Sequence, residues 1–181
     1  MRTLPCHTWR RDFRGGVRGE REGPTGGESE GGPAARPGPI SLIRLGASAV
    51  TLGGLLKRLA HVEDSHFARL WLGTPAGAPW DAVDWDSDPD WAYRSAAQDT
   101  PEQLRALWRE SATRSRAVVD AALLSAGGGL DQLGAHITRG GERPNLRRIL
   151  LDLIEEYARH VGHADLIRES VDGLTGEDPP R

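Results

Sequence analysis

Apolar residues recur every three to four positions in three separate stretches of this chain. The first stretch covers 51–72, and Thr51 at its start can cap a helix. Its apolar positions are Leu52, Leu55, Leu56, Leu59, Val62, Phe67 and Leu70. Because this spacing is close to the 3.6-residue period of an α-helix, we expect the first helix over 51–72.

The second stretch has the sharpest start. Thr100, Pro101 and Gln103 place a capping hydroxyl, a proline at the first helical position and a capping-box amide in order. The inner stripe that follows is Leu104, Leu107, Trp108, Ser111, Ser115, Val118, Val119 and Ala122. The two small serines in mid-stripe either leave room for a ligand or allow close helix packing, and packing is the favoured interpretation.

The third stretch begins after Asn145, which can cap a helix, and Gly173 is a plausible end. Its stripe is Leu146, Ile149, Leu150, Leu153, Tyr157, Val161, Ala164 and Ile167. The glycine-rich segment 126–143 is expected to be a loop, and 73–99 a long connection with three tryptophans. No strand pattern of similar strength occurs, so the sequence predicts an all-α helical bundle.

Length and composition indicate one domain and argue against nucleic acid and membranes as partners. With 181 residues and a formal net charge of −3, it has no bulk attraction for nucleic acid or for an anionic membrane. Its single cysteine, Cys6, excludes an internal disulfide and fits a reducing compartment. No apolar run approaches the roughly 20 residues that span a bilayer. We therefore expect a soluble, cytoplasmic protein that binds neither nucleic acid nor membrane.

The N-terminal segment differs in composition from the rest. Residues 1–39 are crowded with glycine, arginine, glutamate and proline and have almost no periodic apolar pattern. They are predicted to be disordered, or to result from a misassigned start. The predicted organisation is a helical bundle domain over 40–176 followed by a short tail, 177–181.

The best candidates for metal-binding residues lie on the last helix. Glu156 and His160 are four positions apart and share the inward face of that helix, the spacing at which two side chains can hold one metal ion. Zn²⁺ or Ni²⁺ suits an oxygen and a nitrogen ligand. The alternative, favoured by spacing alone, is an ordinary buried Glu–His or Glu–Arg pair. His163 and Asp165 are expected to support the pair or the helix end, and Glu155 with Arg159 to form a surface ion pair.

Several blocks of sequence point to a known superfamily. They are TLGGLLKRLAHVED at 51–64, DPDW at 88–91, LRRIL at 146–150 and GHAD at 162–165. With them, residues 47–176 resemble the DinB-like superfamily, in particular actinobacterial proteins related to mycothiol-dependent transferases and maleylpyruvate isomerase. The resemblance implies a four-helix bundle with a divalent metal on three ligands, and a low-molecular-weight thiol as substrate. Glu156 and His160 match two of the three metal ligands.

The chain departs from that pattern at the third ligand. In the helix expected over 51–72, the position of the family's metal-binding histidine is occupied by Arg58. His61 is a weak substitute, because the helical wheel places it nearly opposite the apolar face. A guanidinium cannot lose its proton to become a ligand, but Arg58 could turn inward, pair with Glu156 and occupy the space of the metal.

The chain also has no counterpart of the family's first helix in 1–39. The three remaining helices would then expose an apolar flank, which either a second copy of the chain, as a homodimer, or residues 40–50 would cover. Two functions remain open. One is a metal-dependent transferase of a mycothiol-type thiol, and the other is a metal-free, non-catalytic bundle held by an Arg58–Glu156 pair.

Overall fold

The computed structural model describes residues 43–44, 48–138 and 140–176, and this part of the chain is all-α. Within these ranges there is no strand, and only isolated bridges join Arg44 to Thr51 and Leu133 to Asn145. The expected all-α class is confirmed. The expectations for 1–39 and 177–181 concern residues outside the described ranges.

The first long helix begins where its cap predicts. Helix α1 spans Leu52–Asp64, and the Thr51 hydroxyl accepts a hydrogen bond from the Gly54 amide at 3.0 Å. The helix continues with wider, π-helical turns over Ser65–Leu72 and ends at Gly73, which has the left-handed conformation (φ 69°) that glycine adopts without strain. The expected helix over 51–72 is therefore confirmed, with a change of winding at Ser65.

The other two long helices also have the predicted ends. Helix α3 spans Pro101–Leu124, and both hydrogen bonds of the Thr100–Gln103 capping box are present. Helix α4 spans Leu146–Asp172, with Asn145 as its N-cap and Gly173 as its left-handed C-cap. None of the helices in the described ranges is long and apolar enough to cross a membrane.

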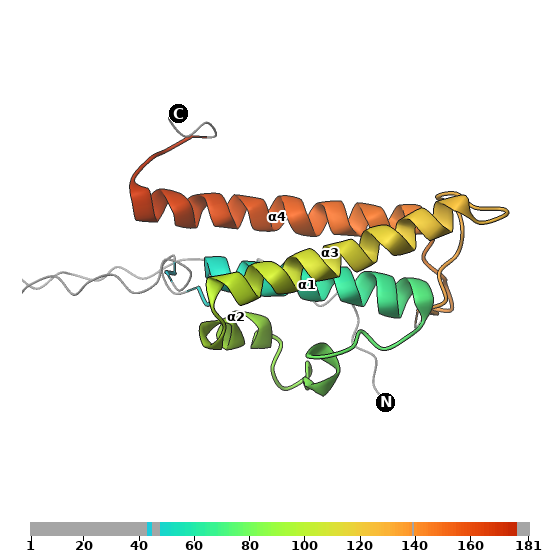
Figure 1. The fold of residues 1–181 in the computed structure, drawn as a ribbon, viewed down its shortest axis with the longest axis horizontal. Helices are drawn as coiled ribbons and strands as arrows, with labels where there is room; N and C mark the ends of the chain where they lie inside the picture. Colours follow the sequence, from blue (N-terminus) through green and yellow to red (C-terminus); the bar gives the residue numbers. More distant parts are fainter. Residues whose placement is uncertain (1–42, 45–47, 139, 177–181) are drawn as a thin grey trace, which may run out of the picture. The chain divides into compact units, whose positions relative to one another are not determined.

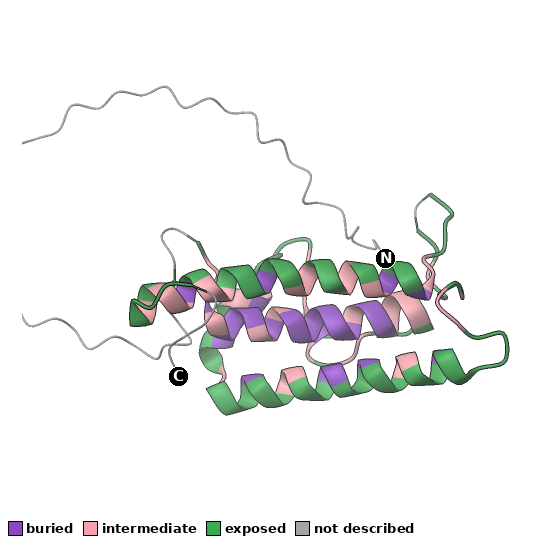
Figure 2. Cartoon of the chain, turned by 90° about the horizontal axis from the view of Figure 1, so that it is seen from above, coloured by how far each residue is buried: buried purple, intermediate pink, exposed green. Residues whose placement is uncertain are grey.

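Helix α1 lies between α3 and α4 and packs against both (Figures 1 and 2). Figure 2 shows α1 as the most buried of the three. The core at one end of the bundle joins Phe67, Ala122, Leu146 and Ile149, which all have at most 6% of their surface exposed. Because α1 is the middle helix, charged side chains on it that point toward either neighbour are removed from water.

The connection after Gly73 is more ordered than a loop. It contains a short turn of 3-10 helix at Trp80–Ala82, the short helix α2 at Trp91–Ser95 and a second 3-10 turn at Ala96–Gln98. Elements of three to five residues are too short to produce a periodic pattern, so the sequence indicates a long connection here but not its helical turns. Helix α2 packs against α1 at Gly54, where a Cβ would lie 2.9 Å from the Tyr93 Cα. The connection thus covers a third side of α1.

Candidate functional site

Glu156 and His160 lie together on α4, and Arg58 of α1 reaches them. Glu156 Oε2 is 3.4 Å from His160 Nε2 and 3.6 Å from Arg58 Nη2. The Glu156 and Arg58 side chains are 18% and 24% exposed, and His160 is buried. The guanidinium does turn inward and faces the carboxylate, as the alternative in the sequence analysis predicted.

The neighbours of Glu156 keep it ionised. The contact with His160, followed by the positive charge of Arg58, lowers the pKa of Glu156 to about 2 although its burial acts in the opposite direction. Its Oε2 atom is fully enclosed and has no hydrogen-bond partner of good geometry. The carboxylate is therefore a half-buried negative charge between two guanidinium groups, that of Arg58 and that of Arg159, whose Nη1 donates to Glu156 Oε1 at 3.4 Å.

A three-ligand metal site does not fit these residues. Within the described ranges, no group of three or more His, Cys, Asp or Glu side chains is placed to hold a metal. Glu156 and His160 supply two ligands, and Arg58 brings a permanent positive charge to the same carboxylate oxygen that would bind the ion. The resident metal that the resemblance implies would have to displace that guanidinium.

His61 lies in an unexpected environment. The helical wheel places it away from the apolar face of its helix, but it is only 8% exposed because the tryptophan-bearing connection covers it. Its ring stacks on Trp85 with centroids 4.0 Å apart and is tilted against Trp80 at 5.1 Å. His61 is therefore buried on the side of α1 opposite its apolar face, because the connection covers that side.

The contacts of His61 make it a support for Arg58. Burial, followed by the charge of Arg58, lowers the pKa of His61 to about 3, so the imidazole is neutral at physiological pH. Arg58 Nη1 is 3.4 Å from His61 Nδ1. Because arginine only donates, Nδ1 accepts, and the ring hydrogen is assigned to Nε2. His61 therefore helps to orient the guanidinium toward Glu156.

Asp64 is a buried residue that the sequence pattern did not indicate, and it joins three parts of the fold. Its carboxylate accepts hydrogen bonds from Trp80 Nε1 at 2.9 Å, from Ser111 Oγ at 2.7 Å and from two Arg114 nitrogens, each at 3.0 Å. These donors come from the connection and from α3. Ser111 in mid-stripe is thus a hydrogen-bond donor to Asp64, and this polar position on the inner face of α3 was the available signal.

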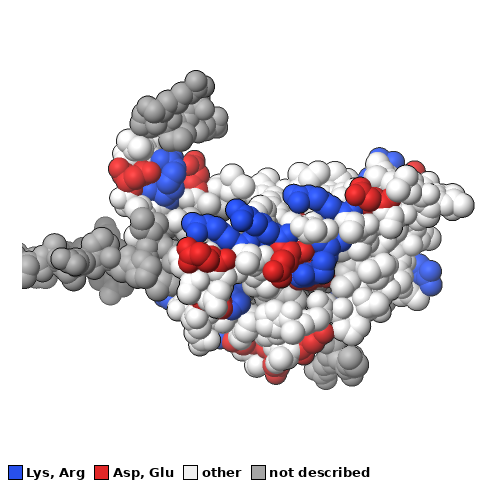
Figure 3. All heavy atoms as spheres, in the orientation of Figure 1, with Lys and Arg blue, Asp and Glu red and all other residues white. Residues whose placement is uncertain are grey.

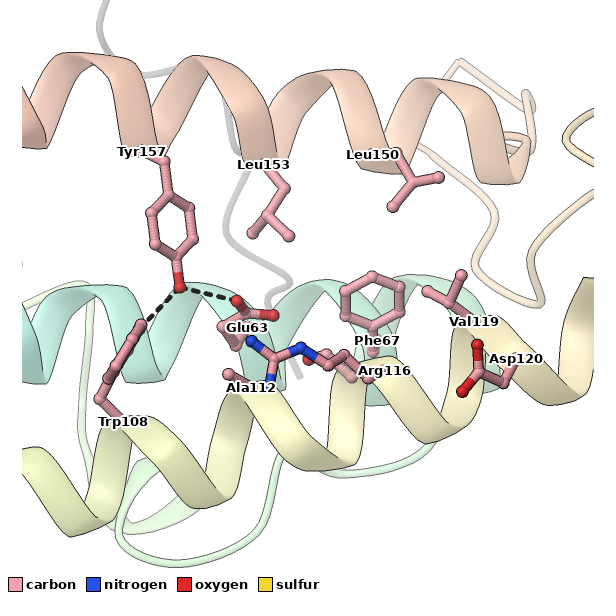
Figure 4. A pocket seen from close by; sticks show the side chains of 11 residues that line it. Glu63, Phe67, Trp108, Ala112, Arg116, Val119, Asp120, Leu150, Leu153 and Tyr157 are labelled. Atoms are coloured by element: carbon pink, nitrogen blue, oxygen red, sulfur yellow. Dashed lines mark hydrogen bonds between the residues drawn. The ribbon is translucent and has the colours of Figure 1, made fainter.

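A groove between α1, α3 and α4 contains a second set of buried polar groups (Figure 4). Tyr157 donates to Glu63 Oε1 and accepts from Trp108 Nε1, both at 2.7 Å. The cavity measures about 460 Å³, and its apolar lining includes Phe67, Val119, Leu150 and Leu153. Glu63 and Ser115 also line it, and their Oε2 and Oγ atoms are buried without a hydrogen-bond partner. Ser115, unlike Ser111, therefore borders an open space.

The remaining residues singled out on α4 lie at the margin. His163 Nδ1 is 3.4 Å from His160 Nδ1, so it contacts the pair from outside. Asp165 forms an ion pair with Arg168 at 2.9 Å and not with His160. Glu155 and Arg159 form the expected surface ion pair at 2.7 Å.

Comparison with known proteins gives one match. The family model described as mycothiol-S-transferase matches residues 42–173, more than two thirds of the chain, and these residues include α1 to α4 and both buried polar clusters. No curated protein and no solved structure matches the chain. The match agrees with the resemblance carried by the sequence blocks. The chain therefore belongs to the mycothiol-S-transferase family, which is DinB-like and thiol-related.

Proposed function

We propose that this chain binds a low-molecular-weight thiol of the mycothiol type and does so as a metal-independent member of its family. The observation that carries the proposal is the Arg58–Glu156 contact at 3.6 Å. The Arg58 guanidinium supplies positive charge to Glu156 Oε2, the oxygen that faces away from the other cation, Arg159, which donates to Glu156 Oε1. Arg58 thereby takes over the charge-compensating role of a metal without offering an open coordination position.

The groove beside Tyr157 supports the thiol-binding half of the proposal. A thiol carrier with polar substituents needs hydrogen-bonding groups, and an apolar acceptor molecule needs an apolar wall. Glu63 Oε2 and Ser115 Oγ offer an acceptor and a hydroxyl without partners, and Phe67 and Leu153 line the same cavity. Glu63 is the one carboxylate there with an unpaired buried oxygen, so it is the candidate acceptor for a ligand hydrogen.

If the chain is metal-independent because of Arg58, replacing Arg58 with histidine should create a metal-binding site. The purified natural chain, incubated with Zn²⁺ or Ni²⁺ and then dialysed, should retain no metal above background. Arg58→His restores a third ligand beside Glu156 and His160 and should retain about one ion per chain in elemental analysis. Arg109→His is the matched control, because it adds a histidine on the exposed face of α3, where positions three and four residues away carry no ligand.

The competing function is a metal-dependent transferase. It would be supported by stoichiometric metal in the natural chain that disappears in Glu156→Ala, and that result would overturn the Arg58 proposal. The family assignment would not change, because it rests on residues 42–173 as a whole.

If the chain binds thiols without a metal, mycothiol should bind the natural chain in the presence of a chelator. In isothermal titration, Ser115→Ala and Glu63→Gln should each weaken binding by about tenfold, the value of one hydrogen bond of roughly 1.4 kcal/mol. Thr113→Val removes a hydroxyl from an exposed position of the same helix and should leave the affinity unchanged. Equal affinity in all the variants would place the thiol elsewhere, and no binding would reject the thiol-binding half while leaving the metal result intact.

A further inference from the structure

The outer side of α4 carries an exposed apolar row that no part of the described chain covers. Leu151, Ile154 and Val161 are 55%, 64% and 62% exposed, and Ala158 between them is also exposed. The row is extended by one charged residue at each end, and it is called the α4 seam here: Arg147, Leu151, Ile154, Ala158, Val161 and Asp165.

The spacing of the seam is that of a helix-pairing surface. Its members are separated alternately by four and three positions, the pattern by which one helix packs along another in coiled coils. A single exposed aliphatic side chain is ordinary, but a contiguous row of them marks an interaction surface. Figure 3 shows uncharged atoms over the middle of α4 on the face drawn, while charged side chains surround α3 below it.

The order of residues in the seam suits pairing with the same helix of a second copy in the antiparallel direction. Read outward from its centre, the seam has mirror-related spacing, with Ile154 and Ala158 innermost, then Leu151 and Val161, then Arg147 and Asp165. In an antiparallel pair of identical helices, Ile154 would face Ala158 of the second copy, so that a bulky side chain meets a small one. Leu151 would face Val161 of the second copy, so that two aliphatic side chains meet.

The terminal charges distinguish the two possible directions. Antiparallel pairing sets Arg147 opposite Asp165 of the second copy, twice per dimer, whereas parallel pairing sets like charges opposite each other. Both side chains are accessible, with 51% and 43% exposed, although Arg147 also contacts Asp131 and Asp165 also contacts Arg168. We propose that two copies of this chain associate antiparallel through the α4 seam, an inference that is independent of the proposed function.

Oligomeric mass tests the surface. Sedimentation equilibrium of the full chain should give about twice the 19.6 kDa of one chain, and Ile154→Glu should give the mass of one chain. The control Leu124→Glu places the same charge on a leucine that is 87% exposed at the end of α3, outside the seam, and should leave the dimer intact. Circular dichroism checks that both variants fold, as expected for exposed positions.

Charge exchange tests the direction. Arg147→Asp or Asp165→Arg alone turns two attractive contacts into two repulsive ones and should raise the dissociation constant by about tenfold. The double variant Arg147→Asp/Asp165→Arg should restore the natural value. A monomer at every concentration, an intact dimer in Ile154→Glu, or failure of the double variant to restore association would each overturn the proposal.

Discussion

Replacing Asp64 with alanine is expected to lower the free energy of unfolding by about 3–5 kcal/mol. The change leaves Trp80 Nε1 and the Ser111 hydroxyl without their acceptor, and both residues are 0% exposed. Arg114 loses its bidentate carboxylate at the same time. Because these donors belong to the connection and to α3, the loss weakens the attachment of both to α1. Urea unfolding followed by circular dichroism measures the effect.

Two further variants separate the possible causes. Asp64→Asn keeps an oxygen acceptor at the same place but loses the charge, so it should fall between the natural chain and Asp64→Ala. Glu155→Ala removes an exposed carboxylate from its ion pair with Arg159 and should cost well under 1 kcal/mol. An Asp64→Ala effect as small as that of Glu155→Ala would show that the Asp64 network does not hold the fold together.

Acidification below about pH 6.5 is expected to destabilise the folded chain, mainly through His61. The pKa of His61 falls from 6.5 to about 3 on folding, so between these values the unfolded chain binds the proton and the folded chain does not. Stability is therefore lost as the pH falls through this window, at up to about 1.4 kcal/mol per pH unit. Burial also lowers the pKa of His66, which adds to the loss in the same direction.

Glu156 extends the loss to lower pH. Its pKa falls from 4.5 to about 2, so its contribution is complete above pH 4.5 and disappears as the pH decreases toward 2. The interval between pH 6.5 and pH 4.5 is thus specific to the histidines. Unfolding free energies measured across this interval isolate their effect.

The histidine assignment is tested with a ring of similar shape. His61→Phe retains an aromatic ring beside Trp85 but cannot be protonated, so its stability should change much less between pH 6.5 and pH 4.5. Leu133→Phe adds a ring at an exposed position of the segment before α4, leaves every histidine in place and should keep the natural slope. The same slope in His61→Phe and in the natural chain would show that His61 is not the group that couples folding to pH.

The ends of the long helices were predictable from sequence because they depend on local chemistry. Thr51, Thr100 and Asn145 cap the helices that follow them, and Gly73 and Gly173 end helices in a left-handed conformation. Each of these decisions involves a side chain and backbone groups within a few residues. The all-α class followed from the same local signals together with the apolar period.

The sequence also identified Glu156, His160 and Arg58, through spacing and family resemblance, but it left their contact open. An i,i+4 interval places two side chains on one face, whereas the approach of Arg58 from another helix depends on the packing of α1 against α4. The 3.6 Å contact with Glu156 is a tertiary result. The proposal of a metal-independent site follows from that contact.

What the sequence by itself determined is which segments form helices, where these begin and end, and to which family the pattern belongs. Only the tertiary structure decided the surroundings of His61, Asp64 and Glu63. A helical wheel counts apolar neighbours on one helix and cannot show that short, non-periodic elements cover the opposite side. The burial of these groups and the identity of their partners therefore depend on residues far away in the chain, which come together only on folding.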